Sequence, residues 1–421
     1  MIARTAERKF SGPRMVAIAA LAMGMTAPGQ TASISVFIDP MIADLGIGRT
    51  AVSAAYMIGT LAGALALPAV GRAVDRHGVR TVMSTVAAAL GLALVGLSFA
   101  DDLFGLTLGF VGIRMLGQGA LGLCAATLVS RWYAKRRGQA LSVQIAVGGG
   151  IIALSPVPLE RLITAFDWRT AMLVEAAVVA LVLLPTALIW VRGRPADLGQ
   201  FIDGDPANGG RSRIESGMDP SEAMRRPYFW VLVGVFATAG FFNAAIGFHL
   251  IAILGERGLS ATEAAANFLP QAVAGTLATL LVGVVIDRAG PRAVIAVAML
   301  AFAAAFVWGT AVAPGWSAVC FGIVFGGCGN ALRAIENGIT PRLFGTAGIG
   351  ALRGVVSSVT ITCSAFAPLL YSLCYAWTGS FSPVLWLSAA VPLAVAVAAL
   401  TAPLPRPVAE TGPDQVAHLT S

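Results

Sequence analysis

Long apolar runs separated by short polar breaks dominate the chain. The stretches 81–100, 293–313 and 380–403 contain no charged side chain. A helix of about twenty apolar residues matches the thickness of a bilayer core, and a helix satisfies its own backbone hydrogen bonds in lipid. The pattern therefore predicts an all-α membrane protein with twelve transmembrane helices, numbered here as spans 1–12: 15–38, 51–71, 81–100, 104–129, 139–164, 168–192, 228–254, 262–286, 293–313, 316–341, 352–377 and 380–403.

One long hydrophilic break interrupts the series. Residues 192–227 are rich in Gly, Pro, Asp and Arg, which is the composition of a linker. The break divides the spans six and six. We expect an N-terminal six-helix half at 1–191, a cytoplasmic linker at 192–227, a C-terminal six-helix half at 228–404, and a short polar cytoplasmic tail at 405–421.

Composition supports a membrane protein over a soluble one. Of 421 residues, 57% are hydrophobic and 12% are charged, against roughly a quarter charged in soluble domains. The apolar run from Met15 continues through Ile38 without a small-residue cleavage site, which favours a span over a cleaved signal peptide. The five cysteines lie inside apolar runs at no metal-ligand spacing, so we expect core residues and no metal site: Cys124, Cys320, Cys328, Cys363 and Cys374.

The net charge of +7 follows from topology. If the N-terminus is cytoplasmic, 22 of the 28 basic residues lie in cytoplasmic segments. Only Arg49, Arg161, Arg169 and Arg257 then lie outside, and two more arginines lie within spans. This imbalance predicts that both termini are cytoplasmic. The basic charge therefore does not indicate a nucleic-acid partner.

A ten-residue pattern occurs twice, at equivalent points of the two halves. The loops at 71–80 and 283–292 both read G-x-x-x-D-R-x-G-x-R, which implies duplication of a six-span unit. Glycine permits a sharp turn, and an acid at a helix end can pair with arginine or accept from a helix N-terminus. We interpret both as gate loops that hold the cytoplasmic side shut, with a plain structural turn as the alternative. Their key residues are Gly71, Asp75, Arg76, Gly78, Gly283, Asp287, Arg288 and Gly290.

The duplicated loop resembles the signature of the major facilitator superfamily, a family of secondary transporters. Span 4 adds R-M-L-G-Q-G at 114–119, which is similar to that superfamily's R-x-x-x-G motif. The resemblance covers essentially the whole chain. It implies a central cavity lined mainly by spans 1, 4, 7 and 10, with spans 3, 6, 9 and 12 peripheral. It implies transport by alternating access, without enzymatic activity or a cofactor.

A narrower resemblance begins before span 5. The segment W-Y-A-K-R-R at 132–137 looks like the equivalent segment of monocarboxylate-transporter-like proteins. The acidic-Gly-aromatic start of span 1 found in the eukaryotic members is missing, so the match is to the bacterial branch, which includes oxalate/formate antiporters. Members of this group often carry a substrate-binding arginine in span 8. No cation occurs at 275–283 here, so the counter-charge for an anion must come from another span.

Ionisable groups within spans are costly unless paired or wetted, and they are functional candidates for that reason. Arg114 lies near the middle of span 4, and Gln118 follows one helical turn later on the same face. Arg114 could bind a carboxylate through two parallel hydrogen bonds or tune a proton-carrying acid. The alternative is a structural arginine that bonds the carbonyls of a neighbouring helix.

Arg333, Glu336 and Asn337 share one face of span 10. The repeat offset places Arg333 about two turns beyond Arg114, so Arg333 could replace the missing span 8 cation. The alternative is an intrahelical pair between Arg333 and Glu336 near the cytoplasmic edge.

Span 7 contributes Asn243 and His249 as further candidates. His249 could relay a proton or donate to an anion, or it could be a satisfied core histidine. Asn243 lies six residues earlier, so the two side chains do not share a face. Glu175 lies in span 6, which the resemblance makes peripheral, and we expect it to be structural.

These features predict a monomeric transporter in a bacterial inner membrane. No G-x-x-x-x-G-K-[ST] loop is present, which argues against a pump driven by ATP. We expect three partners: the lipid bilayer, a small organic anion, and a proton or counter-substrate. A monocarboxylate is the favoured class of anion. The alternative is an exporter of a neutral or cationic organic compound by proton antiport, with the buried arginines structural.

Overall fold

The computed structural model describes residues 10–204, 218–344 and 349–404. Inside those ranges, some side chains lie outside the described set, including those of Asp287, Arg333, Glu336 and Asn337. The described residues form helices and connecting turns, with no strand among them. This confirms the predicted all-α class.

The N-terminal half builds each of its six spans from one to three helical segments. Proline, glycine and π-helical turns divide several of the spans. The segments are α1 Gly12–Gly24, η1 Ala27–Gly29, α2 Thr31–Ser35, α3 Ile38–Leu45, α4 Arg49–His77, α5 Val79–Ser98, α6 Leu103–Ile113, η2 Arg114–Leu121, α7 Gly122–Trp132, α8 Arg137–Leu154, α9 Pro156–Ala165, α10 Trp168–Val178, η3 Val179–Leu183 and α11 Leu184–Trp190.

The C-terminal half has fewer and longer segments. They are α12 Pro220–Arg225, α13 Pro227–Gly255, α14 Ala261–Ala266, α15 Phe268–Gly309, α16 Trp316–Phe344, α17 Ile349–Thr378 and α18 Ser382–Thr401. Helix α15 covers spans 8 and 9, since it turns at the non-helical residue Gly290.

The predicted spans and the observed helices agree closely. Among the described residues, eleven helices are long and apolar enough to cross a membrane, and the apolar part of α16, Trp316–Leu332, is a shorter twelfth segment. Most ends agree with the prediction within three residues and differ in both directions, because a hydropathy pattern does not register the local capping that ends a helix. The twelve-helix layout in two halves is therefore confirmed.

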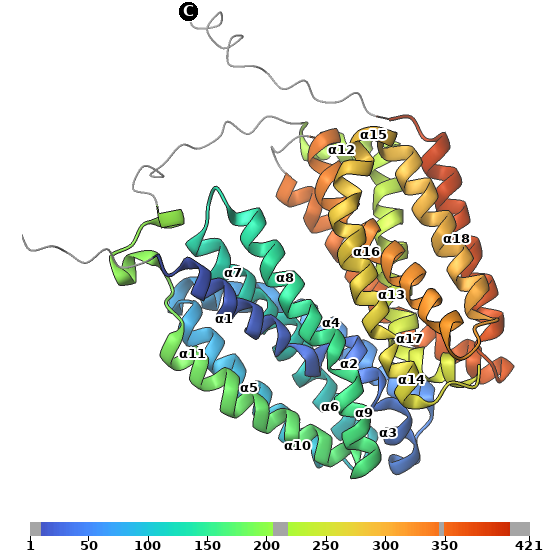
Figure 1. Ribbon diagram of the computed structural model, residues 1–421, viewed down its shortest axis with the longest axis horizontal. Coiled ribbons are helices and arrows are strands. Elements are labelled where there is room, and N and C mark those ends of the chain that lie inside the picture. Colours follow the sequence, from blue (N-terminus) through green and yellow to red (C-terminus); the bar gives the residue numbers. More distant parts are fainter. Residues whose placement is uncertain (1–9, 205–217, 345–348, 405–421) are drawn as a thin grey trace, which may run out of the picture. The chain divides into compact units, whose positions relative to one another are not determined.

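The chain divides into two compact units, Met1–Arg211 and Ser212–Ser421. In the first unit, α1 packs beside α8, and α5 packs beside α10 and α11 (Figure 1). In the second, α15 packs against α16 and α18, and α13 packs against α17 (Figure 1). Each unit therefore has its own helix-on-helix core.

The two copies of the repeated loop adopt the same backbone conformation. Gly78, between α4 and α5, has φ 83° and ψ 153°. Gly290, at the turn of α15, has φ 76° and ψ 158°. This region of the backbone map is accessible almost only to glycine. The duplicated glycine is thus required by geometry in each half.

The last arginine of each copy also makes the same kind of contact. The Nη2 group of Arg80 donates to the carbonyl of Leu188 on α11, and Nη2 of Arg292 donates to the carbonyl of Ala402 after α18. Cations are favourable at helix C-termini, where carbonyls lack partners. In the first half, Arg131 at the end of α7 also pairs with Asp75 at 3.4 Å between nitrogen and oxygen. The repeated loop, between α4 and α5, therefore connects these two helices to α7 and α11.

The first part of the predicted linker folds against the first half. The carboxylate of Asp203 accepts from the backbone N–H groups of Ala134, Lys135 and Arg136. The indole of Trp132 donates to the carbonyl of Arg192 at 2.9 Å. These bonds fix the turn that leads into α8.

A polar cluster at the opposite end of the first half joins three turns. Arg169, at the start of α10, pairs with Asp44 in the last turn of α3 and with Asp101 before α6. Trp168 also donates to Asp44 at 3.1 Å. The Arg169 guanidinium, helped by the Trp168 indole, holds the pKa of Asp44 below its usual value. The cluster therefore stabilises the fold most when Asp44 is ionised.

Replacing Gly78 with alanine should destabilise the protein, because alanine in this backbone conformation costs about 1–3 kcal/mol. The thermal unfolding midpoint of the purified protein in detergent measures the effect. Gly96→Ala is the matched control: Gly96 is helical in α5, and a Cβ there meets no other atom. An unchanged midpoint for Gly78→Ala would show that the turn is not constrained as described.

Replacing Asp44 with asparagine should lower the unfolding midpoint at neutral pH. Because the folded pKa is depressed, the contribution of Asp44 is present above the unfolded pKa and is lost as pH falls through the folded pKa. The difference between the two proteins should therefore shrink in acid, and also at high salt. A difference that stays constant with pH would contradict this assignment.

Candidate functional site

Span 4 changes its winding at its central arginine. Helix α6 begins at the N-cap Asp102, whose carboxylate accepts from the N–H of Gly105 at 2.7 Å. At Arg114 the helix passes into the π-helical segment η2, which runs to Leu121. Such π segments are rare and occur frequently at functional sites. The bulge therefore coincides with the residue that the sequence singled out.

The guanidinium of Arg114 is buried among neutral groups. Its side chain has an exposed fraction of 5%. Nε donates to the hydroxyl of Thr60 at 3.0 Å, and Nη1 donates to the carbonyl of Gly29 at 2.8 Å. The guanidinium carbon lies 4.5 Å from the ring centre of Tyr56, a cation–π contact. Arg114 thereby joins spans 1, 2 and 4.

Span 1 is broken at the point where Arg114 binds it. The segment η1 separates α1 from α2, and its sequence is Ala27-Pro28-Gly29. A Cβ at Gly29 would lie 2.3 Å from the carbonyl oxygen of Ile113 on α6. Only glycine lets the two backbones approach this closely. The hydroxyls of Thr31 and Tyr56 bond at 2.6 Å and hold α2 against α4.

No described carboxylate forms an ion pair with Arg114. Its hydrogen-bond partners are a hydroxyl and a backbone carbonyl, and both are neutral. A buried charge without a counter-ion is costly, and it attracts an anion that can approach it. Among the described residues, the charge of Arg114 is thus surrounded by neutral polar groups only.

Gln118 does not share the environment of Arg114. Gln118 is exposed, whereas Arg114 is buried. Both residues lie in the π-helical segment η2, in which i→i+5 bonding widens the turn. The predicted role of Gln118 stays a prediction.

The second half has no cation at the position that corresponds to Arg114. Position 326, which follows Arg114 by the repeat offset of 212 residues, is Gly326. A Cβ at Gly326 would meet the backbone of Gln271 on α15. The two halves therefore share their helical architecture, but only the first half has an arginine at this pair of equivalent positions.

His249 lies in the core of the second half. Its exposed fraction is 1%, and Nε2 lies 2.9 Å from the carbonyl oxygen of Pro368 on α17. Because a carbonyl only accepts, Nε2 carries the hydrogen. The imidazole stacks on Tyr371 at 6.3 Å between ring centres, with Phe381 at 5.0 Å. These contacts join α13 to α17 around His249, and its predicted role as a proton relay stays a prediction.

The other candidates of the second half divide into two groups. The amide of Asn243 donates to the carbonyl of Ala239 at 2.7 Å and lies at the contact with Gly329 on α16. The side chains of Arg333, Glu336 and Asn337, on α16, lie outside the described residues. Their predicted roles stay predictions.

Among the gate-loop residues, the side chain of Asp287 also lies outside the described set, while Arg76 and Arg288 are exposed.

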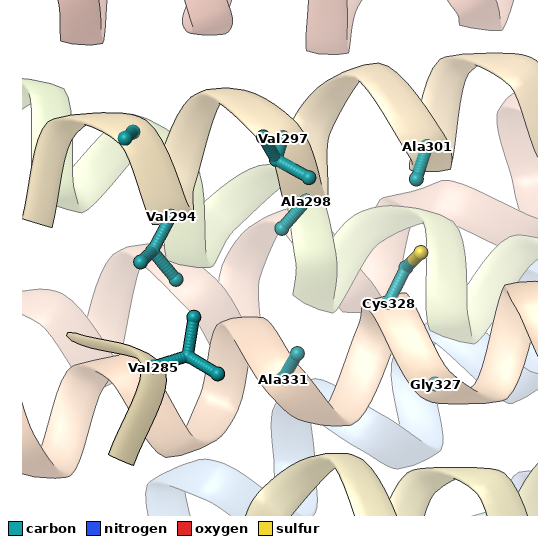
Figure 2. Close-up of a pocket in the computed structure, with 9 residues that line it drawn as sticks. Val285, Val294, Val297, Ala298, Ala301, Gly327, Cys328 and Ala331 are labelled. Atoms are coloured by element: carbon teal, nitrogen blue, oxygen red, sulfur yellow. The ribbon is translucent and has the colours of Figure 1, made fainter. Parts of the chain in front are cut away.

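An apolar pocket of about 310 Å³ lies between α15 and α16. Figure 2 shows Val294, Val297 and Ala298 of α15 facing Cys328 and Ala331 of α16. Its lining contains no charged side chain. This pocket can accommodate apolar atoms only, so it does not supply an anion site.

Sequence reasoning found Arg114 but missed its partners Gly29, Tyr56 and Thr60. Each is an ordinary residue type for a span, and nothing in its spacing marks it. The dipeptide Pro28-Gly29 inside an apolar run was the available signal, since both residues interrupt helices.

Comparison with known proteins decides the family. The family model described as Major Facilitator Superfamily matches residues 15–277, which is well over half of the chain. The chain belongs to this superfamily. It is accordingly a multi-pass membrane transporter of the secondary type.

Solved structures agree with this fold. A bacterial homologue of the human lysosomal transporter Spinster, in an inward-facing and occupied conformation, superposes with a TM-score of 0.67 at 15% identity and covers 94% of this chain and 96% of its own. Its inward-facing, unoccupied form gives a TM-score of 0.68 at 17% identity, with 93% and 95% covered. At these identities the likeness shows the fold alone.

Two curated proteins are similar in sequence. An uncharacterized 38 kDa protein in the 23S RNA operon of Thermoproteus tenax is 26% identical over 372 residues, which are 88% of this chain and 91% of that protein. A riboflavin transporter of Trypanosoma brucei brucei is 26% identical over 204 residues, 47% of this chain and 37% of that transporter. The second match thus spans about a third of that relative.

Replacing Thr60 with valine should destabilise this transporter, because the shape is kept while Nε of Arg114 loses its acceptor. A buried donor left unsatisfied costs about 1–3 kcal/mol. The unfolding midpoint in detergent measures the effect. Thr107→Val is the matched control, since the Thr107 hydroxyl bonds only the carbonyl of Leu103 on its own helix. Equal midpoints for the two variants would contradict the role of Thr60.

Proposed function

We propose that this superfamily member moves a small organic anion, a monocarboxylate in the first instance, across the membrane together with a proton. It works as a monomer by alternating access in a bacterial inner membrane, with both termini cytoplasmic. The positive-inside imbalance of its basic residues supports the orientation. The resemblance of W-Y-A-K-R-R at 132–137 to monocarboxylate-transporter-like proteins supports the substrate class.

One observation carries this proposal: Arg114 is buried within a span without a described counter-ion. Its partners Thr60, Gly29 and Tyr56 do not use all five N–H groups of the guanidinium. The planar fork that remains suits a carboxylate, which can accept two parallel hydrogen bonds. A substrate carboxylate would provide the missing negative charge.

The path of the anion involves the broken segment of span 1. In the described conformation Gly29 occupies one donor of Arg114 with its carbonyl oxygen. A carboxylate is a stronger acceptor than a neutral carbonyl and would compete for that donor. Release of Gly29 would free η1 to move. Substrate binding would thereby change the conformation of span 1.

The proton balances the charge of the cargo. Moving one carboxylate with one proton transfers no net charge, so a pH gradient can drive accumulation. The gate loops would close the cytoplasmic side in one of the two alternating states. Arg333, Glu336 and Asn337, whose side chains lie outside the described residues, stay candidates for a second contact with the anion.

The same contacts of Arg114 favour a second function if the arginine is a structural residue. Arg114 is nearly inaccessible and already bonds the carbonyl of a neighbouring span, as a structural arginine would. The protein would then export a neutral or cationic organic compound by proton antiport. The partial match to a riboflavin transporter is compatible with an uncharged cargo.

Replacing Arg114 with glutamine should abolish carboxylate uptake. Removing a charge-assisted hydrogen bond costs about 1.5–3 kcal/mol, which corresponds to roughly a 10- to 100-fold loss of affinity. Uptake of radiolabelled lactate and of oxalate into liposomes with an alkaline interior measures the effect. Arg161→Gln is the control, since Arg161 is an exposed residue of α9, and this variant should transport like the unmodified protein.

Two outcomes would contradict the anion proposal. Unchanged carboxylate uptake by Arg114→Gln would remove Arg114 from the binding site. Transport of labelled riboflavin, without uptake of either carboxylate, would favour the exporter function instead.

A further inference from the structure

A second polar feature of the first half lies away from Arg114, in a cavity of about 210 Å³. The cavity lies between the break of span 1, the junction of α8 and α9, and the junction of α10 and η3. It is lined by Gly24, Met25, Ala27, Pro28, Ile151, Ser155, Pro158, Leu159, Val174, Glu175, Val178 and Val179. All of these residues belong to one unit, so the cavity is a property of the first half itself.

Glu175 is the titratable residue among those that line this cavity. Its exposed fraction is 9%, and its Oε2 atom is buried without a hydrogen-bond partner. Ser155 is already engaged, since its hydroxyl bonds Ser33 at 2.7 Å. The remaining lining is apolar. The carboxyl group thus lies among groups that neither donate to it nor neutralise it.

The neighbouring elements do not supply a counter-charge inside the cavity either. None of the described charged residues on the helices around Glu175 lines the cavity: Arg14 on α1, Arg80 on α5, Arg137 on α8, Glu160 and Arg161 on α9, and Arg169 on α10. Several have partners elsewhere, such as Arg14 over Trp190 and Arg80 at Leu188. A carboxyl group in such surroundings is favoured as the neutral acid, because an unpaired charge would be costly there.

The cavity and the Arg114 site are on either side of the same short segment. Pro28 lines the cavity, and the next residue, Gly29, gives its carbonyl to Arg114. Segment η1 therefore borders the carboxyl cavity with Ala27 and Pro28 and bonds the buried cation with Gly29. A displacement of η1 at the cavity would alter the acceptor available to Arg114.

We propose that Glu175 is a proton-binding group of this transporter, and that η1 transmits its protonation state to Arg114. The coupling part rests on the proposed function, whereas the proton site does not. In the described conformation Glu175 holds its proton. Loss of the proton leaves a carboxylate that must recruit water or move, and η1 is the broken backbone segment that borders it. Glu175 releases one proton for each anion that is transported. The proton and the anion together carry no net charge across the membrane.

Helix length places the two groups at different depths. Glu175 lies seven residues after the start of α10, and Arg114 lies eleven residues after the start of α6. At 1.5 Å per residue, these positions are about 10 Å and about 16 Å from the helix starts, which lie at the same end of the half. The proton would thus bind nearer that end than the anion.

Infrared difference spectroscopy tests the proton site without any transport substrate. Purified protein is shifted between acid and alkaline buffer, and the carbonyl stretch of a protonated, buried carboxylic acid is followed. We expect this band in the unmodified protein and its loss in Glu175→Gln, in which a neutral amide of nearly the same shape replaces the acid. Glu160→Gln is the matched control, because Glu160 is a buried carboxyl that accepts from Thr164 at 2.9 Å. Persistence of the whole band in Glu175→Gln would overturn the proposal.

Liposomes test the coupling. We expect Glu175→Gln to lose accumulation of labelled lactate driven by a pH gradient and to retain exchange of labelled for unlabelled lactate without a gradient. Glu160→Gln should retain both. Retained exchange also shows that the variant is folded. Accumulation by Glu175→Gln equal to that of the unmodified protein would overturn the coupling role.

The two proposals fail in different ways. If the unmodified protein does not transport lactate while the infrared band is present and depends on Glu175, the organic-anion function fails and the proton site is supported. If lactate transport depends on Arg114 while the band is independent of Glu175, the anion function is supported and the proton site fails.

Discussion

The contact between the Arg114 guanidinium and the carbonyl of Gly29 organises the first half of this transporter. It joins the break of span 1 to the π-helical turn of span 4, and Thr60 and Tyr56 attach span 2 to the same charge. A cation in this position needs polar partners, because lipid and apolar side chains provide none. The backbone meets this need by opening a helix at Pro28 and Gly29, where carbonyl groups are released from helical bonding.

The two halves have a similar helical architecture, but only the first half has to provide polar partners for a buried arginine at this position. The duplicated loop gives each half a glycine of positive φ and an arginine on the carbonyl of its last helix. Where the first half has Arg114, the second has Gly326 packed on the backbone of α15. The symmetric features serve the fold, and the asymmetric charge is the place where specificity for a cargo can arise.

The helices could be predicted well from the sequence because a membrane span depends on the summed hydrophobicity of consecutive residues. Twenty apolar residues in a row leave few alternatives to a helix, and the repeated loop marked the division into halves. The sequence also identified Arg114, since a charge inside a span is costly enough to be conspicuous. It did not identify Gly29, Tyr56 or Thr60, because these residues acquire their roles only from three-dimensional contact. It did not predict the cavity beside Glu175, because a cavity depends on the packing of three helices. The π turn that contains Gln118 was not predicted either, because it cannot be read from residue spacing.

The central claim is that the buried cation binds a carboxylate, and equilibrium binding tests it most directly. The unfolding midpoint of the purified protein is measured against increasing lactate and oxalate, for the unmodified chain and for Arg114→Gln. A ligand that binds only the folded state raises the midpoint with its concentration. The account predicts such a rise for the unmodified protein and its absence in the variant. An equal rise in both proteins, or a rise with riboflavin alone, would contradict it.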